Sequence, residues 1–189
     1  APPTEPVQSR PPVVFPETWR FSSHDTPVSA EHAVVVSTDS VASAIGALVM
    51  QEGGNAVDAA VAVSFALAVV NPQAGNIGGG GFMVVRMADG TAAALDYREK
   101  APLAATRDMF LDDRGNLTDK SVVGHLAAGV PGSVMGMWEA HRRFGTLQWA
   151  DLVEPAASLA DGFEVHERFR DNIVSSERGL RLFEATAAT

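Results

Sequence analysis

The spacing of apolar positions along the chain predicts a short buried strand, a series of helices and one β-hairpin. The four apolar residues at 33–36, three of them valine, are typical of a buried strand over 32–37. Two later strand-like runs are joined by a loop at Ala88-Asp89-Gly90. The predicted elements are strands over 32–37, 82–87 and 91–97, and helices over 41–51, 56–70, 133–144, 147–159 with an interruption near Pro155, and 167–182. This order predicts an α+β domain built in layers.

Polar residues and glycines set the ends of the first two helices. Residues 38–40 can each cap the first helix, and the glycine pair at 53–54 ends it. Asn55 caps the second helix, and Asp58 stands near the positive end of its dipole. We expect one face of the first helix to carry Val41, Ile45, Leu48 and Val49, and the helix over 133–144 to carry Val134, Met137, Trp138 and His141 at helical spacing.

The helix over 56–70 is apolar on nearly all sides, so we expect it inside the protein. It is shorter than the ~20 apolar residues that span a bilayer. The formal net charge of −9 is opposite in sign to that of a general nucleic-acid or anionic-membrane binder. We therefore expect neither a membrane nor a nucleic acid as partner.

Composition also limits the chemistry. Of the 189 residues, 46% are hydrophobic and 20% are charged, which is enough to form a core. The absence of cysteine excludes disulfides, thiolate metal ligands and a cysteine nucleophile. Prolines crowd residues 1–16 and predict an extended arm over 1–30, followed by one domain over 31–189. A start at Ala1 fits a mature chain after removal of a signal peptide, or a trimmed chain.

The glycine run at 78–81 is the most conspicuous feature of the sequence. A phosphate-binding P-loop would need a following Gly-Lys-Ser/Thr, and a dinucleotide loop would lead into a helix. This run leads into a predicted strand instead. It therefore favours close packing of the backbone or an anion-binding nest, of which packing is the stronger interpretation.

Arg98 is the best single candidate for binding a ligand, because a guanidinium binds a carboxylate through two parallel hydrogen bonds. From the residues alone, a structural salt bridge with Asp96, Glu99 or a distant acid is the stronger interpretation. Ser133 reads as a helix cap rather than a nucleophile. We expect His141, together with Arg142 and Arg143, to lie on a solvent-exposed face of its helix.

The five histidines do not form a site. His24, His32, His125, His141 and His166 are scattered and lack metal-ligand spacing, so no metal is expected. The residues alone therefore give one carboxylate-binding candidate, no cofactor and no complete catalytic set. Any chemistry needs another segment or another chain.

Several motifs, in order, resemble the gamma-glutamyltransferase (gamma-glutamyltranspeptidase) family. Residues 53–60, GGNAVDAA, match a segment of that family, and residues 71–83 resemble its glycine-rich segment. Residues 96–102, DYREKAP, resemble its REKAP box. Further similarity runs through 105–110, 129–132 and 154–163, so that it covers roughly 34–165.

The resemblance implies an αββα sandwich of the N-terminal-nucleophile hydrolase type. In that family, a precursor cuts itself into a large and a small subunit. The N-terminal threonine of the small subunit attacks the gamma-glutamyl amide of glutathione-like donors, and the acyl-enzyme then passes the group to water or to an amino acid or peptide. The family arginine that grips the substrate α-carboxylate falls on Arg98, and no catalytic residue is expected in this chain.

The resemblance also implies a partner and a location. The chain corresponds to about half of a large subunit and needs the small subunit from the same precursor, in the periplasm or outside the cell. A cephalosporin acylase and a poly-gamma-glutamate-cleaving enzyme are alternatives on the same scaffold. A non-catalytic binding or assembly protein is an alternative of another class, which the first residue of the partner chain would distinguish.

Overall fold

The computed structural model of the chain describes residues 29–175 and residue 181. Residues 29–34 belong to a separate unit from the one that begins at Val35, and they contain no helix or strand. The arm predicted over 1–30 lies outside the described residues, except for its last two positions. The larger unit contains α1 (Ser40–Gln51), α2 (Ala56–Val70), β1 (Phe82–Arg86), β2 (Ala92–Asp96), the short 3₁₀ turns η1 (Asp119–Ser121) and η2 (His125–Ala127), α3 (Ser133–Phe144), α4 (Trp149–Ala160) and α5 (Glu167–Val174).

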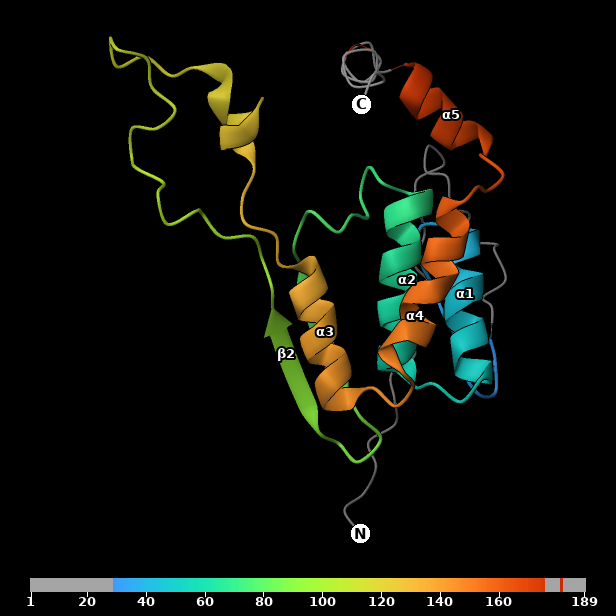
Figure 1. Cartoon of the computed structure of the whole chain (residues 1–189). Helices are drawn as coiled ribbons and strands as arrows, with labels where there is room; N and C mark the ends of the chain where they lie inside the picture. Colours follow the sequence, from blue (N-terminus) through green and yellow to red (C-terminus); the bar gives the residue numbers. More distant parts are fainter. Residues whose placement is uncertain (1–28, 176–180, 182–189) are drawn as a thin grey trace, which may run out of the picture. The chain divides into compact units, whose positions relative to one another are not determined.

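Helix α2 is the centre of the helical layer, with α1 and α4 packed against it (Figure 1). The helix is buried on most sides, as its apolar sequence predicts. Val61 and Ala62 of α2 share a core cluster with Val49 of α1, Met137 of α3 and Leu152 of α4. Within the described part of the chain, no helix combines the length and apolar character needed to cross a membrane.

The hairpin forms as predicted and covers part of this layer. Strands β1 and β2 are antiparallel, and Met87 N donates to Thr91 O at 2.8 Å, which closes a three-residue loop. Gly90 in that loop has a φ of +89°, a conformation that favours glycine. Val85 and Leu95 are buried on the inner face of the hairpin, where they cluster with residues of α2 and α3.

The opposite face of the hairpin is apolar and open. The side chains of Phe82 and Val84 are 66% and 82% exposed. In the register of the hairpin, Val84 lies opposite Ala94 and Phe82 lies opposite Asp96. The described residues thus form one helical layer and a two-stranded sheet with an uncovered outer face.

The strand predicted over 32–37 is wrong. Residues 33–37 form no strand, and in the described part of the chain the sheet contains β1 and β2 alone. Val36 is 84% exposed, whereas Val35 is half-buried against the cluster of α1 and α2. A run of β-branched residues favours an extended backbone, but a strand also needs a neighbour to bond with.

Helix α4 is continuous, so the interruption predicted near Pro155 is wrong. Proline removes one hydrogen bond to the carbonyl of the residue four positions earlier, here Asp151. Asp151 is exposed to solvent, and the helix is anchored by the buried side chains of Leu152 and Ala156. Burial on both sides of the proline therefore outweighs the missing bond.

Two other predictions hold only in part. In α1 the buried positions are Ala42, Gly46 and Val49, whereas Leu48 is 54% exposed. Small residues thus face α2, because they allow the two helices to approach closely. Helix α5 begins at Glu167 as predicted and ends at Val174 with Ser175 as its cap, and most of the predicted extension to 182 lies outside the described residues.

Candidate functional site

Arg98 follows the end of β2 and carries an exposed side chain. Its side chain is 62% exposed, and its Nε lies 3.3 Å from Oε2 of Glu99. The carboxylate of Asp96 instead accepts a hydrogen bond from the backbone N–H of Arg98, at 3.0 Å. The expected salt bridge therefore forms with Glu99. Because it uses Nε, it does not occupy the two Nη groups that can grip a carboxylate together.

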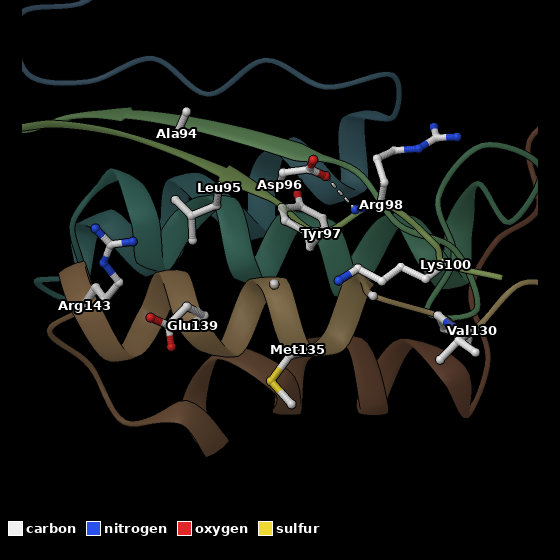
Figure 2. Close-up of a pocket in the computed structure, with 13 residues that line it drawn as sticks. Ala94, Leu95, Asp96, Tyr97, Arg98, Lys100, Val130, Met135, Glu139 and Arg143 are labelled. Carbon is white, nitrogen blue, oxygen red and sulfur yellow. Dashed lines mark hydrogen bonds between the residues drawn. The ribbon is translucent and has the colours of Figure 1, made fainter. Parts of the chain in front are cut away.

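The guanidinium of Arg98 points to the outer side of the hairpin (Figure 2). Ala94 points to that same side, whereas Leu95 and Tyr97 point toward α3, as expected from the alternation of side chains along a strand. Arg98 therefore stands at the end of the uncovered apolar face. A ligand bound by Arg98 would lie at this end of the hairpin.

A cavity of about 390 Å³ runs between β2 and α3, and Tyr97 and Arg98 are among its lining residues (Figure 2). Lys100, Glu139 and Arg143 line it together with Met135. No motif in the sequence predicted this cavity. The signal was present, because Met135, Glu139 and Arg143 follow one another at intervals of four and so share one face of α3.

The carboxylate of Glu139 is paired with an arginine of its own helix. It accepts two hydrogen bonds from Arg142, from Nη2 at 2.8 Å and from Nε at 3.0 Å. The guanidinium of Arg142 holds the pKa of Glu139 below its ordinary value. The carboxylate thus stays ionised, and it also interacts electrostatically with Arg143, which lines the cavity.

Tyr97 packs its ring between the hairpin and α3. It joins the cluster that contains Val85, Leu95 and Ala140. Burial raises the pKa of the Tyr97 hydroxyl, because the ionised form loses its hydration there. Tyr97 is therefore a packing residue that anchors the backbone directly before Arg98.

The glycine run at 78–81 packs closely against this segment, which confirms the structural interpretation of the run. A Cβ at Gly80 would lie 2.5 Å from Tyr97 O, and one at Gly81 would lie 3.0 Å from the Tyr97 ring. The carbonyl of Gly79 accepts hydrogen bonds from Gly132 N at 2.8 Å and Ser133 N at 3.0 Å. The glycines thus join Tyr97 to the start of α3.

Two predictions about polar side chains near α3 are wrong. The Ser133 hydroxyl does not cap α3, because the helix begins after Gly132 and its first N–H groups bond to Gly79 O. His141 is half-buried rather than solvated, with Nε2 2.8 Å from Leu147 O. Its ring lies 5.9 Å from that of Trp138 and 5.4 Å from that of Trp149. Arg142 and Arg143 are exposed, as predicted.

A histidine with an acidic partner lies in another part of the fold. His166 Nε2 lies 3.3 Å from Oδ2 of Asp39, the residue that caps α1. Across residues 29–175 and 181, no group of three or more histidine, aspartate or glutamate side chains could hold a metal ion. The site is therefore built on Arg98 and the segments that hold it.

Comparison with known proteins identifies the family that the chain resembles. The family model described as gamma-glutamyltranspeptidase matches residues 42–189. The matched range contains the hairpin, the glycine run and Arg98.

Individual relatives extend the match. The chain is 52% identical over 149 residues to the glutathione hydrolase proenzyme of Escherichia coli. The aligned region covers 78% of this chain and 26% of that protein. It is 38% identical over 175 residues to the Acylase ACY 1 proenzyme of Pseudomonas sp. strain SE83, covering 89% of this chain and 31% of that protein. The crystal structure of Helicobacter pylori gamma-glutamyltranspeptidase superposes with a TM-score of 0.80 at 45% identity, covering 85% of this chain and 46% of that one.

The chain spans only part of these proteins. It corresponds to about a quarter of the length of the Escherichia coli relative and to less than half of the Helicobacter pylori chain.

Proposed function

Because the chain belongs to the gamma-glutamyltranspeptidase family, we propose that it is part of the large subunit of a gamma-glutamyl acyltransferase or hydrolase. Its fold is part of the αββα sandwich of the N-terminal-nucleophile hydrolases. The substrate is a gamma-glutamyl amide such as glutathione. The products are the free amine and a glutamyl group transferred to water, an amino acid or a peptide.

In the proposed reaction the nucleophile comes from the partner chain. The small subunit, cut from the same precursor, contributes an N-terminal threonine whose free α-amine acts as base for its own hydroxyl. The hydroxyl oxygen attacks the gamma-carbonyl carbon and the amine of the donor leaves, which gives an acyl-enzyme. Attack by water or by an acceptor amine on that ester releases the threonine.

The role of this chain is to hold the donor, and the position of Arg98 is the observation that supports it. The guanidinium is exposed at the end of the apolar outer face, and its pairing with Glu99 leaves the two Nη groups for a ligand. A donor whose α-carboxylate is bound there is fixed at one end. Fixing the donor in this way reduces the entropy lost when the amide meets the nucleophile.

The test is a substitution series at Arg98 in the complete enzyme, assayed with gamma-glutamyl-p-nitroanilide. Because lysine lacks the two-pronged geometry, we expect Arg98→Lys to raise KM about tenfold and Arg98→Ala to raise it further. Arg107→Lys is a matched control, because the Arg107 side chain is 95% exposed and lies 3.9 Å from its acidic neighbour Asp108. An Arg98→Lys enzyme with an unchanged KM would refute this role.

A second candidate is an acylase for glutaryl-type donors, which the relation to Acylase ACY 1 supports. A glutaryl group carries a carboxylate at the same distance from the amide but lacks the α-amine, so Arg98 would suit either donor. Rates with glutaryl-p-nitroanilide and gamma-glutamyl-p-nitroanilide distinguish the two. A preference for the glutaryl donor would favour the acylase.

We also propose a periplasmic or secreted location, as the family resemblance implies. Fractionation of cells that express the complete precursor tests it. Recovery of the enzyme from the cytoplasm alone would contradict this location.

A further inference from the structure

We infer that Gly79, Gly80 and Gly132, here called the glycine clamp, are positioning residues that set where the Arg98 guanidinium stands. This inference rests on the proposed role of Arg98 in binding the donor carboxylate. It assigns a task to the glycine run beyond packing, and it makes the clamp a determinant of specificity for carboxylate-bearing donors.

The first half of the clamp lies against the peptide groups on either side of Arg98. A Cβ on Gly80 would lie 2.5 Å from Tyr97 O, 2.7 Å from Glu99 N and 2.9 Å from Arg98 C. All three are backbone atoms, so no rotation of a side chain could relieve the contact. Only a residue without a Cβ allows the backbone of 97–99 to stay where it is.

The second half of the clamp closes on the same peptide groups from the start of α3. A Cβ on Gly132 would collide with the carbonyl of Tyr97. The two halves are bonded to each other, because Gly79 O accepts from Gly132 N at 2.8 Å. The carbonyl of Tyr97 thus lies against Gly80 and Gly132, and the bond from Gly132 to Gly79, the neighbour of Gly80, holds these two segments together.

The segment is also fixed just beyond Arg98. Lys100 and Val130 exchange two backbone hydrogen bonds, with Val130 N donating to Lys100 O at 2.8 Å and Lys100 N donating to Val130 O at 3.2 Å. Before Arg98, the ring of Tyr97 is held in the cluster under the hairpin. The backbone of Arg98 therefore has fixed points on both sides.

The clamp also reaches the side chain of Arg98 through Glu99. Glu99 Oε2 lies 3.3 Å from Arg98 Nε, and a Cβ on Gly79 would lie 3.3 Å from Glu99 Oε1. A methyl group at 79 would press on the carboxylate that orients the guanidinium. Misplacement of a binding group by about 1 Å can cost up to about a hundredfold in rate, so small displacements here are measurable.

Three adjacent glycines give a graded test in the complete enzyme. A Cβ at Gly78 would meet only Asn76 Oδ1 at 3.7 Å, which is an ordinary contact, so Gly78→Ala is the control. Gly79→Ala would press on the ends of the Asn76 and Glu99 side chains, and Gly80→Ala on backbone. We expect KM for gamma-glutamyl-p-nitroanilide to be unchanged in Gly78→Ala, raised about threefold in Gly79→Ala and raised about tenfold or more in Gly80→Ala.

A second donor separates positioning from general damage. 4-Aminobutyryl-p-nitroanilide keeps the amine and the scissile amide but lacks the α-carboxylate, so Arg98 has nothing to bind. The preference for the gamma-glutamyl donor is measured as the ratio of the two kcat/KM values. We expect the loss of this preference to be smallest in Gly79→Ala, larger in Gly80→Ala and largest in Arg98→Ala. Activity on the aminobutyryl donor should stay within about twofold of wild type, since its binding does not use the guanidinium.

The outcomes separate the inference from the function on which it rests. If Arg98→Ala leaves the donor preference unchanged, the proposed binding role is wrong. If Arg98→Ala abolishes the preference while Gly80→Ala keeps it, the clamp is not a positioning device. The same conclusion follows if Gly80→Ala lowers the rates with the two donors equally. Should Gly80→Ala fail to fold, Gly79→Ala decides alone, and an unchanged preference in that variant overturns the inference.

Discussion

At the scale of single residues, Asp58 shows how a motif that resembles a functional signature can serve the fold. Its side chain is fully buried and accepts from Asn55 N at 2.9 Å, which completes the capping box of α2. It also accepts from the Thr146 hydroxyl at 2.6 Å and from Thr146 N at 3.1 Å. The carboxylate thus links the start of α2 to the loop between α3 and α4.

Removing this carboxylate should be costly. Asp58→Ala would remove the buried acceptor on which the N–H of Asn55 and the N–H and hydroxyl of Thr146 converge, so we expect a loss of about 3 kcal/mol in the free energy of unfolding. Urea denaturation measures it. Asp151→Ala is the control, because Asp151 is exposed in the first turn of α4 and should change stability by less than about 0.5 kcal/mol. A loss at Asp58 no larger than that of the control would contradict its structural role.

Tyr97 gives a prediction about alkaline pH. Because burial raises its pKa in the folded chain, the unfolded chain releases the proton first as pH rises. The contribution of Tyr97 to the free energy of unfolding is then fully present below the ordinary tyrosine pKa of about 10. This contribution declines as the pH rises toward the pKa of Tyr97 in the folded chain. We expect Tyr97→Phe to lose less stability than wild type between about pH 9 and pH 11, measured by thermal unfolding. Parallel losses in the two proteins would contradict the shift.

At this scale, the local roles of residues were predictable from the sequence, whereas their distant partners were not. Asn55 and Asp58 were predicted at the start of α2, because capping depends on neighbours three residues away. The contact of Asp58 with Thr146 joins residues 88 positions apart, and no local pattern encodes it. Arg98 became a strong candidate only through the family motif, since a strand-end arginine beside Glu99 fits a salt bridge equally well.

At the scale of elements, α4 shows that tertiary packing overrides a local signal. Local propensity predicts an interruption at Pro155. The helix nevertheless continues through it, because Leu152 and Ala156 are buried on either side. The hairpin and the ends of α1, α2 and α3 were predictable, because their capping and turn residues act locally. The strand over 32–37 was not, since pairing depends on a neighbouring strand that the described residues do not supply.

The continuous α4 carries its own prediction. Pro155→Ala restores an N–H that can donate to the carbonyl of Asp151, which stabilises the helix. It also increases the conformational entropy of the unfolded chain, which lowers stability. The first effect is larger, so we expect a gain of about 1 kcal/mol in the free energy of unfolding, seen as a higher Tm. Ser158→Ala, at an exposed position of the same helix, should change it by less than about 0.5 kcal/mol. A lower Tm in Pro155→Ala would mean that the proline ring contributes packing that alanine cannot replace.

At the scale of the whole molecule, the uncovered face of the hairpin connects the fold to its assembly. In an αββα sandwich, the faces of the two sheets that carry no helices pack against each other. The face of β1 and β2 that carries no helix in the described residues is the outer one, with Phe82 and Val84 exposed and Arg98 at its end. In the proposed two-subunit enzyme, the second sheet would therefore pack on the same face at whose end the substrate-binding candidate Arg98 stands.

A charge on this face should therefore block assembly and leave the fold of the chain intact. Val84 is 82% exposed, so Val84→Lys should cost the chain alone less than about 0.5 kcal/mol. Between two sheets the same ammonium would be desolvated without a partner, at a cost of several kcal/mol. We expect size-exclusion chromatography of the expressed precursor to show loss of the mature two-subunit enzyme, whereas Val174→Lys, at a 64% exposed position of α5, retains it. Normal assembly of Val84→Lys would mean that the second sheet does not cover this face, and Arg98 would then need another route to the nucleophile.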